Sequence, residues 1–167
     1  ALRREEDNRV TSLDPYVQAT WKPAPHWTVN AGVRHSLVRF SSADRYVVGT
    51  NGDDSGSLRY SATLPAAGIT YAPSAQWRVY VAAGRGFETP TFNELAYRPA
   101  GTGLNFALRP SRSDNLEAGL KWRSVAGAMP RIEATLAVFH TATRDEIVTQ
   151  SNVGGRSTFQ NAGATRR

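Results

Sequence analysis

The sequence has no cysteine among its 167 residues. Disulfide bonds, thiolate catalysis and cysteine-based zinc sites are therefore excluded. The three histidines, His26, His35 and His140, are too scattered to predict a zinc or haem ligand set. The Gly-x-Ser-x-Gly motif of many hydrolases is also missing. We therefore expect neither an enzyme nor a metal site, and no covalently bound cofactor.

A long apolar run is missing as well. The mean hydropathy is −0.43, and no stretch reaches the roughly 18 apolar residues that a membrane-spanning helix requires. A transmembrane β-barrel needs no such run, because each strand turns only every second residue towards lipid. The formal net charge is +6, but basic runs and nucleic-acid-binding motifs are lacking, so we expect no nucleic-acid partner.

What the sequence does contain is a repeated alternation of apolar and polar residues. This period of two is typical of β-strands, whose successive side chains point to opposite faces. It predicts strands over residues 13–21, 27–40, 60–71, 77–86, 115–123 and 131–141, with a seventh beginning near Thr158. Short connections alternate with long ones, which are expected over residues 41–59, 87–114 and 142–157. The pattern predicts an all-β antiparallel meander of about six to seven strands.

All four tryptophans stand beside the short turns and on the apolar side of the predicted strands. They are Trp21, Trp27, Trp77 and Trp122. Indole rings favour the membrane–water interface, where the ring meets acyl chains and the N–H meets water. Short turns on one side and long loops on the other are typical of outer-membrane barrels. We therefore interpret the meander as part of a transmembrane β-barrel.

The polar face of the predicted strands would then line the barrel lumen. It carries the charged residues Arg34, Arg78, Glu117, Lys121 and Glu133. A cation facing lipid at mid-membrane would cost about 2–4 kcal/mol, whereas beside water or an internal plug it is tolerated. A soluble antiparallel sandwich with one wet face shows the same alternation. A soluble all-β binding module therefore stays open as an alternative.

One stretch resembles a known family. Residues 84–95, Gly-Arg-Gly-Phe-Glu-Thr-Pro-Thr-Phe-Asn-Glu-Leu, are similar to the TonB-dependent outer-membrane receptors. The residues that carry this resemblance are Arg85, Gly86, Phe87, Pro90, Asn93 and Glu94. Residues 108–121, 138–148 and 159–163 look like further segments of the same barrel. Ser111 departs from the family, which usually has glutamate at that position.

The resemblance implies a fold, a location and partners. Residues 1–167 would form part of the barrel, with the plug domain and the barrel's C-terminal end absent, in the outer membrane of a Gram-negative bacterium. The transported ligand would be a ferric siderophore-like chelate, and the TonB complex would act through the absent plug. Outer-membrane lipid and lipopolysaccharide would surround the wall. A passive porin or structural barrel is the alternative within the membrane.

The loop predicted over residues 87–114 contains the candidate ligand-binding residues. Arginine binds anionic chelates through forked hydrogen bonds, and aromatic rings offer flat contacts. The candidates are Arg98, Arg109, Arg112, Tyr97 and Phe106. The same arginines could instead bind lipopolysaccharide phosphates or keep the loop soluble. For the family-like residues the alternative is a structural role, in which Pro90 ends the strand and Asn93 and Glu94 make local hydrogen bonds.

Overall fold

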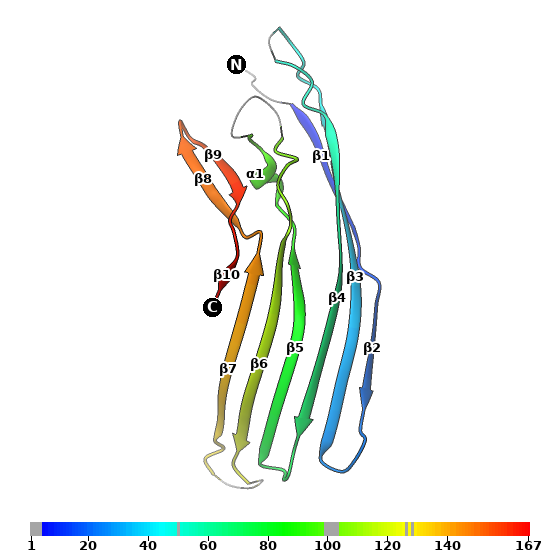
Figure 1. The fold of residues 1–167 in the computed structure, drawn as a ribbon, viewed down its shortest axis with the longest axis vertical. Helices are drawn as coiled ribbons and strands as arrows, with labels where there is room; N and C mark the ends of the chain where they lie inside the picture. Colours follow the sequence, from blue (N-terminus) through cyan, green and yellow to red (C-terminus); the bar gives the residue numbers. More distant parts are fainter. Residues whose placement is uncertain (1–4, 50, 99–103, 126, 128) are drawn as a thin grey trace.

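The computed structural model describes residues 5–49, 51–98, 104–125, 127 and 129–167. A long antiparallel sheet dominates the fold, and a small hairpin and a short helix lie at one end of it (Figure 1). The sheet contains β1 (Glu6–Leu13), β2 (Tyr16–Trp21), β3 (Trp27–Asp44), β4 (Gly56–Tyr71), β5 (Trp77–Glu88), β6 (Ser111–Arg123), β7 (Glu133–Arg144) and β10 (Thr165–Arg166). The hairpin is β8 (Ile147–Val153) with β9 (Arg156–Asn161), and the helix is α1 (Phe92–Leu95).

The strands follow one another across the sheet in chain order. β1 and β2 both pair with β3, one above the other, and the order then runs β3, β4, β5, β6, β7 and β10. Every pairing is antiparallel. This arrangement confirms the predicted all-β meander. The edge strands of the described sheet are not paired with each other, so the sheet is an open wall rather than a closed barrel.

The register collects the apolar residues on one face. Val29 lies opposite Ile69, Ile69 opposite Val81, Val81 opposite Ala118, and Ala118 opposite Val138. One apolar row therefore crosses five strands without interruption. Because side chains alternate along each strand, the rows two residues above and below lie on the same face. Large apolar side chains on this face are open to the surroundings, as the 67% exposure of Val138 shows.

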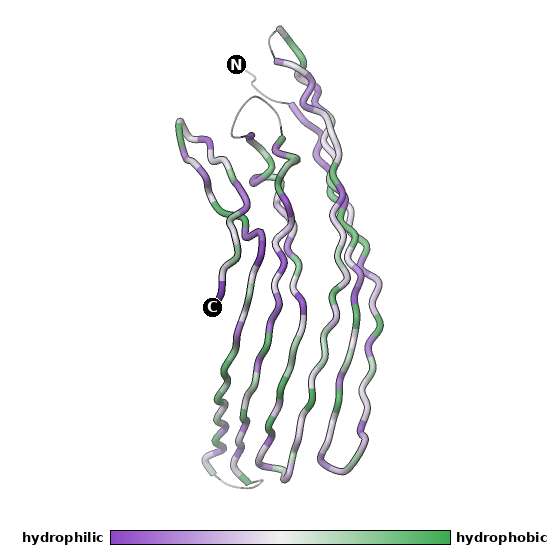
Figure 2. The backbone as a smooth tube through the Cα atoms, viewed as in Figure 1, coloured by the Kyte–Doolittle hydropathy of each residue, from purple (hydrophilic) through white to green (hydrophobic). Residues whose placement is uncertain are grey.

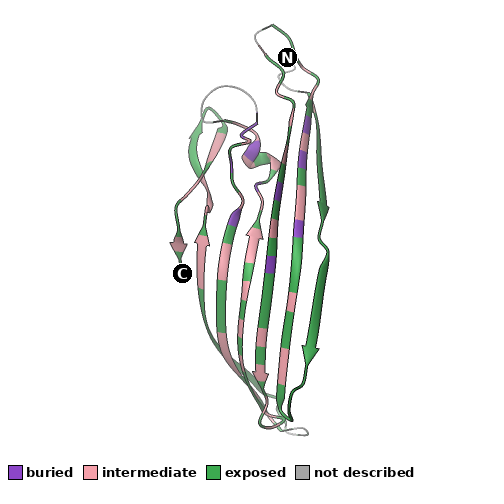
Figure 3. Ribbon diagram, turned by 45° about the vertical axis from the view of Figure 1, so that its right-hand side comes forward, coloured by how far each residue is buried: buried purple, intermediate pink, exposed green. Residues whose placement is uncertain are grey.

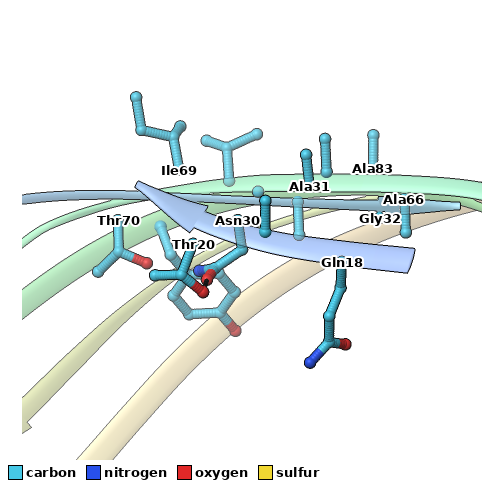
Figure 4. Close-up of a pocket in the computed structure, with 15 residues that line it drawn as sticks. Gln18, Thr20, Asn30, Ala31, Gly32, Ala66, Ile69, Thr70 and Ala83 are labelled. Atoms are coloured by element: carbon cyan, nitrogen blue, oxygen red, sulfur yellow. Dashed lines mark hydrogen bonds between the residues drawn. The ribbon is translucent and has the colours of Figure 1, made fainter. Parts of the chain in front are cut away.

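The opposite face is polar, and the sheet curves towards it. In Figure 4, Ile69, Ala31 and Ala83 point to one side of the sheet, and Thr20, Asn30 and Gln18 point to the other. The remaining strands sweep away on the polar side (Figure 4). The convex face is therefore apolar and the concave face polar, as in the wall of a barrel with a wet lumen. Figure 2 shows the same alternation along the lower strands.

The tryptophans lie at or next to the strand ends that the short turns connect. These turns are at the lower end of the sheet in Figure 1. Trp77 and Trp122 face each other across β5 and β6 with ring centroids 6.3 Å apart. Trp27 packs on Tyr71 at 4.6 Å. The prediction of an aromatic row on the apolar face beside the short turns is confirmed. Among the described residues, no helix has the length and apolar character needed to cross a membrane.

The predicted strand ends were wrong at the loop side of the sheet. β3 continues to Asp44 and β4 begins at Gly56, so both ends of the loop expected over 41–59 are strand. β1 was missed except for Leu13, because most of its residues are polar, and the strand predicted over 13–21 is interrupted at Asp14 and Pro15. The loop expected over 142–157 contains β8. Beyond the apolar band both faces of a strand meet water, and the alternation that marks a strand fades.

The predicted seventh strand also needs correction. A strand does cover Thr158, but it is β9, which pairs with β8 in the hairpin. The next strand of the wall is β10, where Thr165 lies opposite Thr143 of β7. The hairpin forms a separate two-stranded sheet and lies above β7, beyond the wall (Figure 1).

Candidate functional site

The loop between β5 and β6 has a compact core of its own. Leu95, Leu104 and Leu108 are buried and pack with Phe40 of β3 and Tyr60 of β4. Figure 3 shows that the buried residues gather at this end of the molecule. Burying three leucines removes apolar surface from water and stabilises a loop in which the helix α1 is only one turn long. We call residues 89–110, of which 99–103 lie outside the described part, the inner loop.

The inner loop lies on the concave side of the sheet. Phe40 is on the same face of β3 as Asn30, because ten residues separate them. Tyr60 is likewise on the face of β4 that carries Thr70. The Tyr60 hydroxyl donates a hydrogen bond to the Leu108 carbonyl at 2.6 Å. The loop is therefore folded inward, over the lumen face of the β3–β4 hairpin.

A capping box starts helix α1. The Thr91 hydroxyl accepts a hydrogen bond from the backbone N–H of Glu94 at 3.3 Å, and the Glu94 carboxylate accepts from the Thr91 N–H at 2.7 Å. These bonds satisfy two helix donors that would otherwise lack partners. Pro90, just before the cap, is fully buried, and the Asn93 carbonyl accepts from the Ala96 N–H. Pro90, Asn93 and Glu94 thus shape the inner loop.

The other family-like residues build the end of β5. A Cβ on Gly86 would collide with the Ser113 hydroxyl of β6, so glycine at this position leaves room for that side chain. Phe87 packs against the core of the inner loop. The Arg85 Nε forms an ion pair with Asp114 of β6 at 3.1 Å.

The β8–β9 hairpin supports the inner loop from the other side. The Asn105 side-chain amide donates to the Phe159 carbonyl at 3.2 Å. The Asn161 side chain accepts from the Arg109 N–H and donates to the carbonyls of Arg109 and Asp145, each at 2.8 Å. The Arg109 guanidinium forms an ion pair with Asp145 at 2.6 Å. The loop is thereby anchored to both β3–β4 and β8–β9.

The structure does not bring the five candidate ligand-binding residues together. Phe106 packs against the loop core, with its ring directly over Gly56. Arg109 pairs with Asp145. The assignment of Arg112 to the loop was wrong, because β6 begins at Ser111 and carries Arg112. Tyr97 and Arg98 are neighbours on the inner loop.

A third residue joins Tyr97 and Arg98. The guanidinium of Arg156, the first residue of β9, lies over the Tyr97 ring at 5.3 Å from its centroid. The Arg98 Nε donates to the Leu104 carbonyl at 2.7 Å, which orients its guanidinium. Both arginines are exposed residues. Sequence reasoning missed Arg156, because 58 positions separate it from Arg98 in the chain. We call Tyr97, Arg98 and Arg156 the cationic cluster.

In and beside the connection between β3 and β4, the carboxylates of Asp44 and Asp53 accept hydrogen bonds from nearby backbone N–H groups. Hydrogen bonds from the Ser55 side chain and backbone N–H hold the pKa of Asp53 below its usual range. The Asp44 carboxylate accepts from the Tyr46 and Asp54 N–H groups. Within the described residues, no group of three or more histidine, aspartate and glutamate side chains could hold a metal ion.

The concave face lower in the wall carries an ordered polar network. The Tyr80 hydroxyl donates to the Glu117 carboxylate, and the Lys121 ammonium lies 5.3 Å from the centre of the Tyr80 ring. Gly119 makes room for this ring, because a Cβ there would meet it at 2.5 Å. The alternation places Arg34, Arg78 and Glu133 on the same face. The prediction that these charges face the lumen agrees with the register.

An open wall with an apolar convex face, a polar concave face and an inward-folded loop defines a segment of an outer-membrane transport barrel. The family model "TonB dependent receptor-like, beta-barrel" matches residues 2–167. The chain therefore belongs to the β-barrel family of the TonB-dependent receptors. These barrels are outer-membrane proteins of Gram-negative bacteria, and the family comprises transport receptors rather than enzymes.

Solved structures of receptors share this fold. The copper transporter OprC matches with a TM-score of 0.71 and 17% identity, over 96% of this chain and 25% of OprC. The ferric-catecholate import receptor Fiu of E. coli K12 matches with 0.70 and 18%, over 96% and 24%. The alcaligin receptor FauA of Bordetella pertussis matches with 0.61 and 20%, over 96% and 26%. The chain thus spans about a quarter of the length of these proteins.

Proposed function

We propose that these 167 residues form part of the wall and the outer loops of a receptor that imports an anionic metal chelate, such as a ferric siderophore. The plug and the remaining strands would come from other parts of the receptor. The TonB complex would act on the plug to release the ligand inward. No covalent chemistry is involved, and the surrounding partners are outer-membrane lipid and lipopolysaccharide.

The cationic cluster is the observation that carries this proposal. The Arg156 guanidinium of β9 lies over the ring of Tyr97, and Arg98 is the next residue on the inner loop, where its Nε donates to the Leu104 carbonyl. The inner loop is folded over the lumen face. Guanidinium groups form forked, charge-assisted hydrogen bonds with carboxylate and catecholate oxygens. The receptors of similar fold are named for copper, a ferric catecholate and alcaligin, so the fold alone leaves the ligand open. The positive charge of the cationic cluster favours an anionic ligand.

The double variant Arg98→Gln, Arg156→Gln is expected to bind a ferric tris-catecholate at least about tenfold more weakly. A hydrogen bond to a charged group contributes about 1.5–3 kcal/mol, and about 1.4 kcal/mol corresponds to a tenfold change in affinity. The measurement is calorimetric titration of the complete receptor. Arg131→Gln, in the turn before β7, is the matched control and should bind normally. Equal affinity in the double variant and the control would remove the cluster from the binding site.

A second measurement separates active import from passive flow. Uptake of the same chelate by cells should stop when TonB is deleted, and the purified receptor should show no open conductance in a planar bilayer. Uptake that continues without TonB, with an ohmic conductance, would instead identify a porin.

A further inference from the structure

The β8–β9 hairpin joins the wall through a narrow base. Within the described residues it pairs with no strand of the wall, and only residues 145–146 and 162–164 connect it to β7 and β10. Asp145 has a φ of 57°, in the left-handed region, where the chain turns sharply from β7 into β8. The Ala162 N–H donates to the Glu146 carbonyl at 2.7 Å and closes the base. The orientation of the hairpin over the inner loop therefore depends on contacts made at and near this base.

Asn161, the last residue of β9, makes three of these contacts. Its Oδ1 accepts a hydrogen bond from the Arg109 N–H, and its Nδ2 donates to the Arg109 carbonyl, each at 2.8 Å. A residue of a paired antiparallel strand uses the same two backbone groups. The Asn161 Nδ2 also donates to the Asp145 carbonyl at 2.8 Å. One side-chain amide thus joins β9 to the inner loop and to the bend after β7.

The neighbouring polar contacts fix the orientation of the hairpin less firmly. The Arg109–Asp145 ion pair joins the same two segments, but the Arg109 side chain is 67% exposed, and exposed ion pairs contribute little. The Asn105 amide makes one hydrogen bond to the Phe159 carbonyl, at 3.2 Å. A single hydrogen bond permits rotation about its own axis, whereas two parallel bonds between the same groups add geometric specificity. The paired bonds of Asn161 therefore set the angle at which β9 leaves the inner loop.

The far end of β9 amplifies any change of this angle. Arg156 is five residues from Asn161, so the two lie about 17 Å apart along the strand. A tilt of about 10° at Asn161 would then move Arg156 by about 3 Å. The Arg156 guanidinium lies 5.3 Å from the centroid of the Tyr97 ring, and a cation–π contact requires about 6 Å or less. A small loss of alignment at Asn161 would therefore remove Arg156 from the ring.

We infer that Asn161 is the positioning residue of the cationic cluster. It holds the hairpin at the angle at which Arg156 meets Tyr97, and it does so through the backbone of Arg109 without being part of the cluster. Its effect on chelate binding rests on the proposed function of the cluster. The placement of the hairpin can be measured without any ligand.

Double electron–electron resonance between spin labels at Asn93 and Val153 measures this placement in the complete receptor. Asn93 belongs to α1, Val153 ends β8 beside the turn of the hairpin, and both are exposed. One narrow distance distribution is expected in the unaltered receptor and a broad one in Asn161→Leu. Gln160→Leu makes the same change at the exposed neighbouring residue and should keep the distribution narrow. An unchanged distribution in Asn161→Leu would overturn the inference, whatever the chelate affinity.

Calorimetric titration with a ferric tris-catecholate separates positioning from general damage. Arg156→Gln and Asn161→Leu should each weaken binding about tenfold, as the loss of a hydrogen bond to a charged group predicts. In the Asn161→Leu receptor, Arg156→Gln should cost less than about twofold more, because Arg156 is already displaced, and such non-additivity marks coupled residues. Arg98→Gln should still cost about tenfold there. Equal losses from Arg156→Gln in both receptors would contradict the inference.

Asn161→Asp serves if the leucine variant does not assemble. Aspartate keeps the acceptor for the Arg109 N–H but loses both donors, so it should broaden the distance distribution and remove the effect of Arg156→Gln in the same way. Gln160→Asp adds the same charge one residue away and should do neither. If the unaltered receptor does not bind the chelate, the transport proposal fails, and the distance distributions alone decide whether Asn161 positions the hairpin.

Discussion

Leu95→Ala is expected to loosen the inner loop and to increase its amide hydrogen exchange by about thirtyfold or more. Leu95 is completely buried between the loop and the inner face of β3–β4. Replacing a buried leucine with alanine costs about 2–5 kcal/mol, because apolar contacts are lost and a cavity remains. About 1.4 kcal/mol corresponds to a tenfold change in the opening equilibrium. The measurement is hydrogen–deuterium exchange of the peptide that covers Phe92 to Leu108 in the complete receptor.

Asn93→Ala provides the matched control for this experiment. Asn93 lies in the same helical turn but its side chain is exposed. Its replacement should leave the exchange of the loop close to that of the unaltered receptor. If both variants exchange alike, the leucine core does not hold the loop on the wall.

Val81→Arg is expected to destabilise the assembled receptor by about 2–4 kcal/mol, the cost of a cation facing lipid at mid-membrane. Val81 lies midway between Trp77 and Arg85 on the convex face of β5. The strand between those two residues is about 26 Å long, and the usual tilt of a barrel strand reduces this to about 20 Å of height, near that of a lipid-facing band. Unfolding by urea in phospholipid vesicles measures the change.

The neighbouring residue supplies the control. Ala82 follows Val81 on the same strand, faces the lumen and lies opposite Glu117. Ala82→Arg should therefore alter the free energy of unfolding by less than about 1 kcal/mol, as expected for an exposed charge beside an acid. A larger loss for Ala82→Arg than for Val81→Arg would mean that the two faces have been assigned the wrong way round.

The membrane-spanning part of the wall could be predicted from sequence because lipid imposes a simple rule there. Val79, Val81 and Ala83 must alternate with polar residues if one side meets hydrocarbon and the other meets water. The tryptophans then mark the end of the band beside the short turns. Those two signals were sufficient to orient the strands and to predict which charges face the lumen.

The loop end could not be predicted in the same way, because water covers both faces there. β8 and β9 are largely polar and have no regular alternation of apolar and polar residues, so the sequence does not mark them as strands. The spacing of Leu95, Leu104 and Leu108 fits neither a helix nor a strand, so their common core becomes visible only in three dimensions. The contact between Arg156 and Tyr97 depends on the position of the β8–β9 hairpin, so it could not be predicted from the sequence.

The residues that carry the family resemblance have mainly structural roles. The resemblance correctly indicated the barrel, but several of its residues serve the loop's own architecture. Glu94 closes the capping box, Pro90 is buried before it, and Gly86 leaves room for the Ser113 side chain of β6. A motif can therefore identify a family through residues that position a site without belonging to it.

Electron paramagnetic resonance of spin labels placed one at a time on the two faces tests the two-sided wall most directly. In the complete receptor in lipid bilayers, labels at Val79, Leu120 and Leu136 should collide often with oxygen, which dissolves in hydrocarbon, and rarely with a water-soluble nickel complex. Labels at Ala82 and Thr135, on the concave face, should show low oxygen access. Equal oxygen access at all five positions, or the reverse pattern, would contradict the account.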